Sequence, residues 1–263
     1  MREFKHMDLD GETLKSPVAI VGLPGIGNVG RIAIEALIES LNAAPVLDFY
    51  CDDFPARVVV RDGISQFPKS SIHLYRAAPD EPHDALFLTA DHQPATGKGV
   101  FDYAEFVVDR FYNLQVREIY SLAAYEQGYS EFFKSYPSPP RIFVSASSSE
   151  LLDKIESLDG MVPTKEGVIN GANGFIPAWG STRYNLEGAC FLGETLGMIK
   201  HDYRASREVM QKVAKLIGLK LEFNILDDRV EQVKEFIDWA MKEIDQRASQ
   251  VDNTDSAQDR YIG

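Results

Sequence analysis

The segment with the strongest chemical signature is a glycine-rich turn near the start of the chain. Gly25-Ile26-Gly27-Asn28-Val29-Gly30 has the spacing G-x-G-x-x-G, which in a dinucleotide site lets the backbone approach a pyrophosphate at a helix N-terminus. Such a site also needs an acid about 20 residues further on, and Asp48 is the candidate. The alternative, which we favour, is that the glycines only let the helix pack close to the sheet, because this motif often occurs by chance. In the binding interpretation the contacting residues are Gly25, Gly27, Asn28 and Gly30.

A second set of residues carries groups suited to acid–base chemistry. Ligands of an open α/β sheet bind beyond the carboxyl ends of its strands, where we expect segments 22–30, 89–94, 145–149 and 193–195 to meet. A pair formed by His92 and Glu194 would suit a hydrolase or a phosphorylase. The alternative, again favoured, is that these polar side chains bind loop backbones and cap helices, because no nucleophile motif such as G-x-S-x-G is present. The side chains concerned are Asn28, Asp91, His92, Ser147 and Glu194.

Other reactive side chains give little sign of catalysis. Cys51 and Cys190 stand far apart without histidines at ligand spacing, so we expect no zinc site and a reduced, cytoplasmic environment. Lys98 lacks the neighbouring hydroxyl and the spacing of a Walker loop. The sequence therefore predicts no metal, no cofactor and no catalytic residue.

The composition restricts the classes of molecule that the protein is expected to bind. The 263 residues are 44% hydrophobic and 25% charged, with a net charge of −13, which is typical of a globular protein and argues against nucleic acid or an anionic membrane as partners. No apolar run approaches the roughly 20 residues that a membrane-spanning helix needs.

The elements that must position these groups alternate between strand and helix. We expect strands at 18–21, 56–60, 72–76, 85–89, 119–124, 141–146 and 189–195, and helices at 29–41, 100–111, 150–158, 202–218 and 227–246. Residues 46–47 are a poor candidate for a second strand. This alternation predicts an α/β fold whose mostly parallel sheet is covered by helices on both faces.

Three stretches are expected along the chain. Residues 1–16 form a polar lead-in, and residues 17–246 form a single α/β domain with C-terminal helices. The apolar residues of the last helix have coiled-coil spacing, so the helix either docks on its own domain, which we favour, or contacts another subunit. Residues 247–263 are acidic and almost without apolar side chains, which predicts a flexible tail.

Four motifs in a fixed order carry a resemblance to a known family. They are residues 22–30, residues 88–94 (Leu-Thr-Ala-Asp-His-Gln-Pro), residues 171–174 (Gly-Ala-Asn-Gly) and residues 192–195 (Leu-Gly-Glu-Thr). Over residues 15–220 the chain resembles the proteasome assembly chaperone 2-like proteins, in particular their archaeal members.

The resemblance implies a three-layer α/β/α fold similar to that of nucleoside phosphorylases, without an established enzyme activity or cofactor. It also implies a homo-oligomeric chaperone that binds proteasome α subunits and assists assembly of the α ring. Some related proteins end in a hydrophobic–tyrosine–any motif, whereas this chain ends in Arg260-Tyr261-Ile262-Gly263, with the tyrosine one position earlier. The candidate partner-binding residues are Tyr261, Ile262 and Gly263. The alternative function is a nucleoside-phosphorylase-like or dinucleotide-binding enzyme that uses the crevice at the glycine-rich turn.

Overall fold

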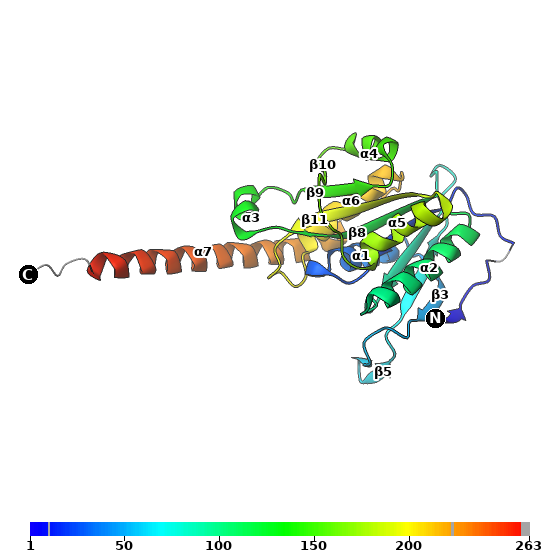
Figure 1. Ribbon diagram of the computed structural model, residues 1–263, viewed down its shortest axis with the longest axis horizontal. Helices are drawn as coiled ribbons and strands as arrows, with labels where there is room; N and C mark the ends of the chain where they lie inside the picture. The colour runs from blue at the N-terminus through cyan, green and yellow to red at the C-terminus, as the bar shows by residue number, and fades with distance from the viewer. Residues whose placement is uncertain (10, 222–223, 259–263) are drawn as a thin grey trace, which may run out of the picture.

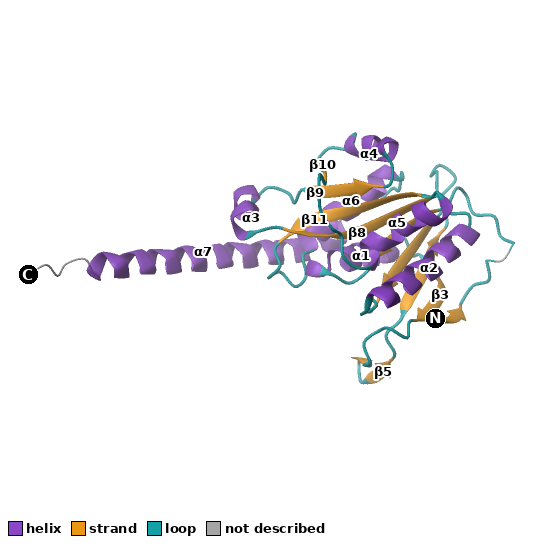
Figure 2. Ribbon diagram, viewed as in Figure 1, coloured by secondary structure: helices purple, strands orange, loops and turns teal. Residues whose placement is uncertain are grey.

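In the computed structural model, which describes residues 1–9, 11–221 and 224–258, a nine-stranded sheet is covered by helices on both faces (Figures 1 and 2). The order of its strands is β1-β3-β6-β7-β2-β8-β11-β9-β10. These strands are β1 (Arg2–Lys5), β2 (Val18–Gly22), β3 (Ala44–Tyr50), β6 (Ser70–Tyr75), β7 (Ala85–Ala90), β8 (Glu118–Glu126), β9 (Ile142–Ala146), β10 (Met161–Pro163) and β11 (Glu187–Thr195). A separate hairpin consists of β4 (Val59–Arg61) and β5 (Ile64–Gln66).

The centre of the sheet is parallel and its flanks are mainly antiparallel. Strands β7, β2, β8 and β11 pair in parallel with one another in this order, as predicted from the alternation of strand and helix. On one side β6, β3 and β1 follow in antiparallel pairs. On the other side β9 pairs antiparallel with β11, and β10 pairs in parallel with β9.

The helices divide between the two faces of the sheet. One core contains residues of α1, α4 and α6, and the other contains residues of α2 and α5. Strand β2 is buried along its whole length and supplies Val18 and Ile20 to the first core and Ala19 and Val21 to the second. The helices are α1 (Val29–Ser40), α2 (Gly97–Asn113), α3 (Tyr129–Ser135), α4 (Ser149–Glu156), α5 (Ala172–Tyr184), α6 (Tyr203–Leu216) and α7 (Asp227–Gln258), with short 3-10 turns η1 (Ile26–Asn28) and η2 (Asn224–Leu226).

The structure differs from the sequence-based expectations at several places. Residues 46–47 belong to strand β3, and the polar lead-in contains the edge strand β1. The strand expected at 56–60 begins only at Val59 and lies outside the main sheet. Helix α5 was not predicted, and α7 continues to Gln258 through part of the expected tail.

Among the helices of the described residues, none is long and apolar enough to cross a bilayer.

Candidate functional site

The glycine-rich turn between β2 and α1 is shaped by close packing. Gly27 has a φ of 59°, and a Cβ atom there would lie 3.2 Å from Thr195 Oγ1. A Cβ atom on Gly30 would lie 2.0 Å from the carbonyl oxygen of Leu122 in β8. Gly25 is extended and has no atom closer than 4.0 Å to its Cβ position. Helix packing and backbone conformation thus account for the second and third glycines of the motif, and not for the first.

Two distant segments complete this turn. The Asn173 side chain, which is buried, accepts a hydrogen bond from Leu23 N at 3.0 Å and donates one to Leu23 O at 3.1 Å. Gln93 donates to the carbonyl of Pro24 and accepts from Ala172 N at 2.7 Å. Three of the four motifs singled out in the sequence therefore meet here, where side-chain amides satisfy backbone groups that the tight turn leaves unpaired.

A crevice of about 710 Å³ lies beside the turn. Gly25 and Gly30 line it, together with Tyr125, whose ring stacks on Phe143 at a centroid distance of 4.0 Å. Its only lining side-chain atom that is buried and without a hydrogen-bond partner, among the residues described, is Thr164 Oγ1. None of the described lining residues is a histidine or a cysteine, and the crevice has the size of a ligand site.

Glu194 lies at the carboxyl end of β11 and does not pair with His92. Arg141 holds its carboxylate through Nη2–Oε1 at 2.6 Å and Nε–Oε2 at 3.1 Å, and Gln127 donates to Oε1 at 3.3 Å. Burial alone would raise the pKa of Glu194, but these hydrogen bonds and the charge of Arg141 outweigh it and lower the pKa. Its carboxylate is fully engaged by these partners, so it does not form the acid–base pair with His92 that the less favoured interpretation required.

His92 and Asp91 follow β7 and make separate contacts. The His92 ring lies edge-on to Phe54 at 6.5 Å, and burial and the charge of Arg57 lower its pKa. Asp91 accepts hydrogen bonds from Lys69 N at 3.1 Å and from Arg31 at 3.4 Å. Asp91 thus fixes loop backbone, as the alternative interpretation expected, and His92 has no acidic hydrogen-bond partner among the residues that the structure describes.

Ser147 lies near the amino ends of the central strands, whereas the glycine-rich turn lies at their carboxyl ends. Because β9 runs antiparallel to β11, the end of β9 adjoins the beginning of β11. Ser147 exchanges hydrogen bonds with Gly188, from N to O at 2.8 Å and from Gly188 N to Oγ at 2.9 Å. The prediction that Ser147 joins the other polar residues was wrong.

Asp48 is also remote from the turn. It lies on β3, which β6 and β7 separate from β2, and Ser71, Lys69 and His6 hold its carboxylate. An acid in this position cannot bind a ribose at the glycine-rich turn, so this part of the dinucleotide interpretation was wrong.

A buried ion pair that sequence analysis missed connects the turn to the start of α6. Asp202 caps α6, and its N–H donates to Gly27 O at 2.8 Å while its carboxylate accepts from Thr195 Oγ1 at 2.7 Å. Arg204 pairs with Asp202 at 3.2 Å and lies over the Tyr136 ring at 5.5 Å. The helix-capping position of Asp202 was visible in the sequence, but its contact with Gly27 depends on the fold.

Tyr136 continues this chain of contacts to α7. Its hydroxyl donates to Asp238 Oδ1 at 2.6 Å and to Lys234 O at 3.3 Å. Burial, together with the hydrogen bond to Asp238, raises the pKa of Tyr136 to about 12. Asn28, the remaining predicted contact residue, adopts a left-handed conformation and donates to Lys200 O at 3.3 Å, so it also ties the turn to the loop before α6.

The first turns of α7 pack on the domain, and the rest of the helix extends away from it (Figure 1). Val233 and Ile237 join a small core with Phe132, which agrees with the expected docking on the chain's own domain. Phe236 and Trp239 lie outside this core, and Trp239 is 58% exposed. Tyr261, Ile262 and Gly263 lie outside the described residues.

The family comparison covers most of the sheet, the glycine-rich turn and the first part of α7. The model of the PAC2 family matches residues 19–241. The chain belongs to the PAC2 family. A protein of Methanocaldococcus jannaschii, MJ1210, is 27% identical over 257 residues, which are 97% of this chain and 95% of the relative.

Two solved structures from another archaeon are similar to this fold. PbaB of Pyrococcus furiosus, described as an archaeal proteasome activator, is 27% identical, with a TM-score of 0.81 over 91% of this chain and 98% of PbaB. PbaA of the same organism, described as an archaeal homologue of proteasome-assembly chaperone, is 21% identical, with a TM-score of 0.69 over 94% of this chain and 96% of PbaA.

Proposed function

We propose that this PAC2 family protein is a non-catalytic chaperone of the cytoplasm that binds proteasome α subunits and assists assembly of the α ring. The observation that carries the proposal is the match to the family over residues 19–241, together with the likeness to PbaB over nearly the whole of both chains. A proteasome-related role is the property that the descriptions of PbaB and PbaA have in common.

The geometry of the turn supports a role without catalysis. The acid best placed at the strand ends, Glu194, is neutralised by Arg141, and Asp202 is neutralised by Arg204. Both pairs hold loops and helices in place. A general acid or base needs a free position for the proton that it transfers, and neither carboxylate has one.

The exposed side of α7 supports a role in binding proteins. Phe236 and Trp239 lie next to each other, with ring centroids 6.1 Å apart, on a helix that extends away from the domain (Figure 1). Aromatic residues of this kind are enriched at the centres of protein interfaces. We assign to this surface, together with the terminal residues Tyr261, Ile262 and Gly263, the contact with α subunits, and we expect the protein to act as a homo-oligomer.

The test is to mix the purified full-length protein with cognate α subunits and to follow co-elution and α-ring formation by native gel. We expect co-elution at micromolar concentration and faster appearance of the ring. Tyr261→Ala distinguishes a contact by the terminus from one by α7, which Trp239→Ser removes. If α subunits neither co-elute nor assemble faster, the proposal is wrong.

The alternative function, a nucleotide- or nucleoside-binding enzyme, rests on the crevice of about 710 Å³. A panel of nucleosides, phosphate and NAD(P) in thermal-shift experiments addresses it, because a ligand of the folded state raises the melting midpoint. Gly25→Val is the matched variant, since Gly25 lines the crevice and its Cβ position is open. A shift that this variant abolishes would favour the enzyme.

A further inference from the structure

A second hollow, of about 1090 Å³, lies between the β1–β3 edge of the sheet and the hairpin of β4 and β5. We call it the hairpin groove. Its floor comes from neighbouring strands, because Arg2 lies opposite Tyr50 and Phe4 packs edge-on against Tyr50 at 5.7 Å. The hairpin and its flanks supply the other wall. The lining residues are Arg2, Phe4, Tyr50, Cys51, Asp52, Phe54, Pro55, Ala56, Arg57, Val58, Gln66, Phe67, Pro68 and Lys69.

Several apolar side chains that line the groove are exposed to solvent. Phe67 is 72% exposed and Phe4 is 62% exposed, and both line the groove. Val58 is exposed in the same place. Exposed apolar side chains that gather at one hollow mark an interaction site, whereas single ones are ordinary.

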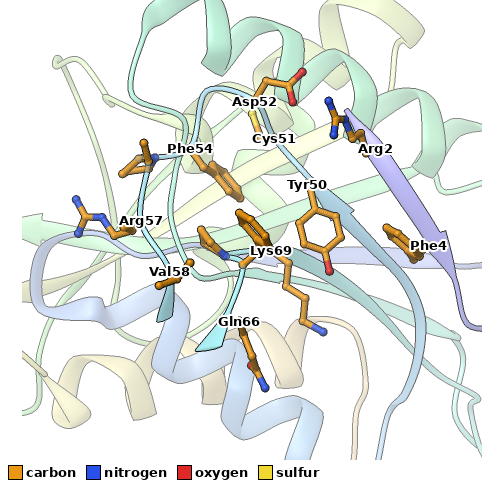
Figure 3. A pocket seen from close by; sticks show the side chains of 14 residues that line it. Arg2, Phe4, Tyr50, Cys51, Asp52, Phe54, Arg57, Val58, Gln66 and Lys69 are labelled. Atoms are coloured by element: carbon orange, nitrogen blue, oxygen red, sulfur yellow. The ribbon is translucent and has the colours of Figure 1, made fainter. Parts of the chain in front are cut away.

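The charge of the groove is opposite to that of the chain. The lining contains three cations and one acid, in a protein with 40 acidic and 27 basic residues. Lys69 is neutralised by Asp48, but Arg2 and Arg57 have no ion-pair partner within the described ranges. Figure 3 shows these two arginines on opposite sides of the rings of Tyr50 and Phe54. An occupant with negative charge and an apolar or aromatic group would satisfy both features.

The size and openness of the groove favour a polypeptide over a small molecule. Small-molecule sites have volumes of roughly 300–1,000 Å³ and bury most of the ligand. This hollow is at the upper end of that range, and two of its aromatic side chains, Phe4 and Phe67, are mostly exposed. A chain segment that crosses the groove would cover exposed side chains on both walls, Phe4 on β1 and Phe67 beside the hairpin.

We propose that the hairpin groove binds an acidic segment of another protein that carries an aromatic side chain. The aromatic group lies among Phe4, Tyr50 and Phe67, and the acids pair with Arg2 and Arg57. This inference does not depend on the proposed function, since it concerns neither α7 nor the crevice and identifies the partner only by its chemistry.

The test measures binding to the full-length protein by fluorescence anisotropy. The probe is a fluorescein-labelled decapeptide made of glutamate, serine and phenylalanine. One control peptide has lysine for every glutamate, and another has serine for every phenylalanine. We expect the acidic aromatic peptide to bind at least about tenfold more tightly than either control, and we expect added salt to weaken that binding.

Two variants locate the site on the protein. Phe67→Ser and Arg57→Glu alter exposed side chains and leave the fold intact, and each is expected to weaken the acidic aromatic peptide about tenfold. The matched controls are Val168→Ser, at an 85% exposed position beside the crevice, and Arg117→Glu, at an exposed position that does not line the groove. Both controls should bind as the wild type does.

Three results would overturn the inference. Equal affinity for the basic peptide would remove its electrostatic basis, and unchanged affinity in both groove variants would place the binding elsewhere. Sedimentation velocity gives the third. If the wild type does not bind peptide and is an oligomer that Phe67→Ser dissociates, the groove is covered by a second copy of this chain.

Discussion

The glycine-rich turn and the hairpin groove use side chains in opposite ways. At the turn, Gly30 leaves no space for a Cβ atom, and the polar groups of Asn173 and Asp202 are paired within the chain. At the groove, Phe4 and Phe67 are exposed and Arg57 has no ion-pair partner among the residues described. The motif that most resembled a ligand site is therefore used to assemble the domain. A region without any recognised motif carries the free binding capacity.

Substitution of the third glycine of the turn is the strongest test of this contrast. Gly30→Ala places a Cβ atom 2.0 Å from the carbonyl oxygen of Leu122, so α1 must move away from β8. We expect the free energy of unfolding to fall by about 3 kcal/mol or more, measured by urea denaturation. Gly25→Ala is the matched control and should change it by less than about 0.5 kcal/mol. Equal effects of the two would show that close packing is not what Gly30 provides.

The second test concerns the paired acid at the end of β11. Glu194→Gln removes the charge that Arg141 neutralises, and we expect a loss of about 2 kcal/mol at neutral pH. The pKa of Glu194 is lowered in the folded state from an ordinary value of 4.5. Between the lowered folded-state pKa and 4.5, the unfolded state binds more protons than the folded state. The stability that this carboxylate contributes therefore rises with pH in that interval and is complete above 4.5.

The pH profile gives this second test its control. The difference in unfolding free energy between wild type and Glu194→Gln should shrink as the pH falls through the folded-state pKa of Glu194. Glu156→Gln, at an exposed site at the end of α4, should leave a constant difference close to zero. A constant difference for Glu194→Gln as well would mean that its carboxylate is not held by Arg141.

A smaller effect is expected where the domain holds α7. Tyr136→Phe removes the hydroxyl that donates to Asp238 and Lys234, at a cost of about 1 kcal/mol. Hydrogen exchange of the amides of α7 between residues 227 and 244 should accelerate. Tyr129→Phe is the control, because within the described part of the chain the Tyr129 hydroxyl has a single hydrogen-bond partner, the Met198 sulfur, at 3.6 Å. Unchanged exchange in Tyr136→Phe would show that apolar packing alone holds the helix.

The smallest effect on stability is expected at the exposed face of α7. Trp239→Ser should alter the free energy of unfolding by less than about 0.5 kcal/mol, while the affinity for α subunits falls about tenfold. Val168→Ser, at a still more exposed position beside the crevice, should leave that affinity unchanged. A loss in both variants, or in neither, would place the contact away from α7.

The parallel centre of the sheet could be predicted because its strands are continuous apolar runs. Val18–Gly22 and Ala85–Ala90 are buried on both faces, and such runs are distinctive in a sequence. Strand β3 escaped notice because it contains Pro45 and Asp48. The proline lies at an irregular pairing, and the acid is held by Ser71 and Lys69, so partners remote in sequence make these residues acceptable in a strand.

Helix α5 and strand β9 illustrate two further limits. Helix α5 contains Pro177 and Gly180, and both residues have low helix propensity. A Cβ atom on Gly180 would lie 2.9 Å from Ile119, so close packing against the sheet outweighs this low propensity. The apolar pattern of β9 does not show in which direction the strand runs. The prediction assumed a parallel strand and therefore placed Ser147 at the wrong end of the sheet. The meeting of Gly25, Gly30, Gln93 and Asn173 could be foreseen in part, as the motifs were recognisable, whereas their hydrogen bonds could not.

The bonds between Leu23 and Asn173 join positions that are 150 residues apart. During synthesis the ribosome must therefore release the chain past Asn173 before the β2–α1 connection can close. Until then the Leu23 amide and carbonyl remain hydrated, and the β2–α1 turn of the amino-terminal half cannot form its native hydrogen bonds with Asn173 of the carboxy-terminal half. The order of translation thus sets the earliest moment at which this domain can reach its native state.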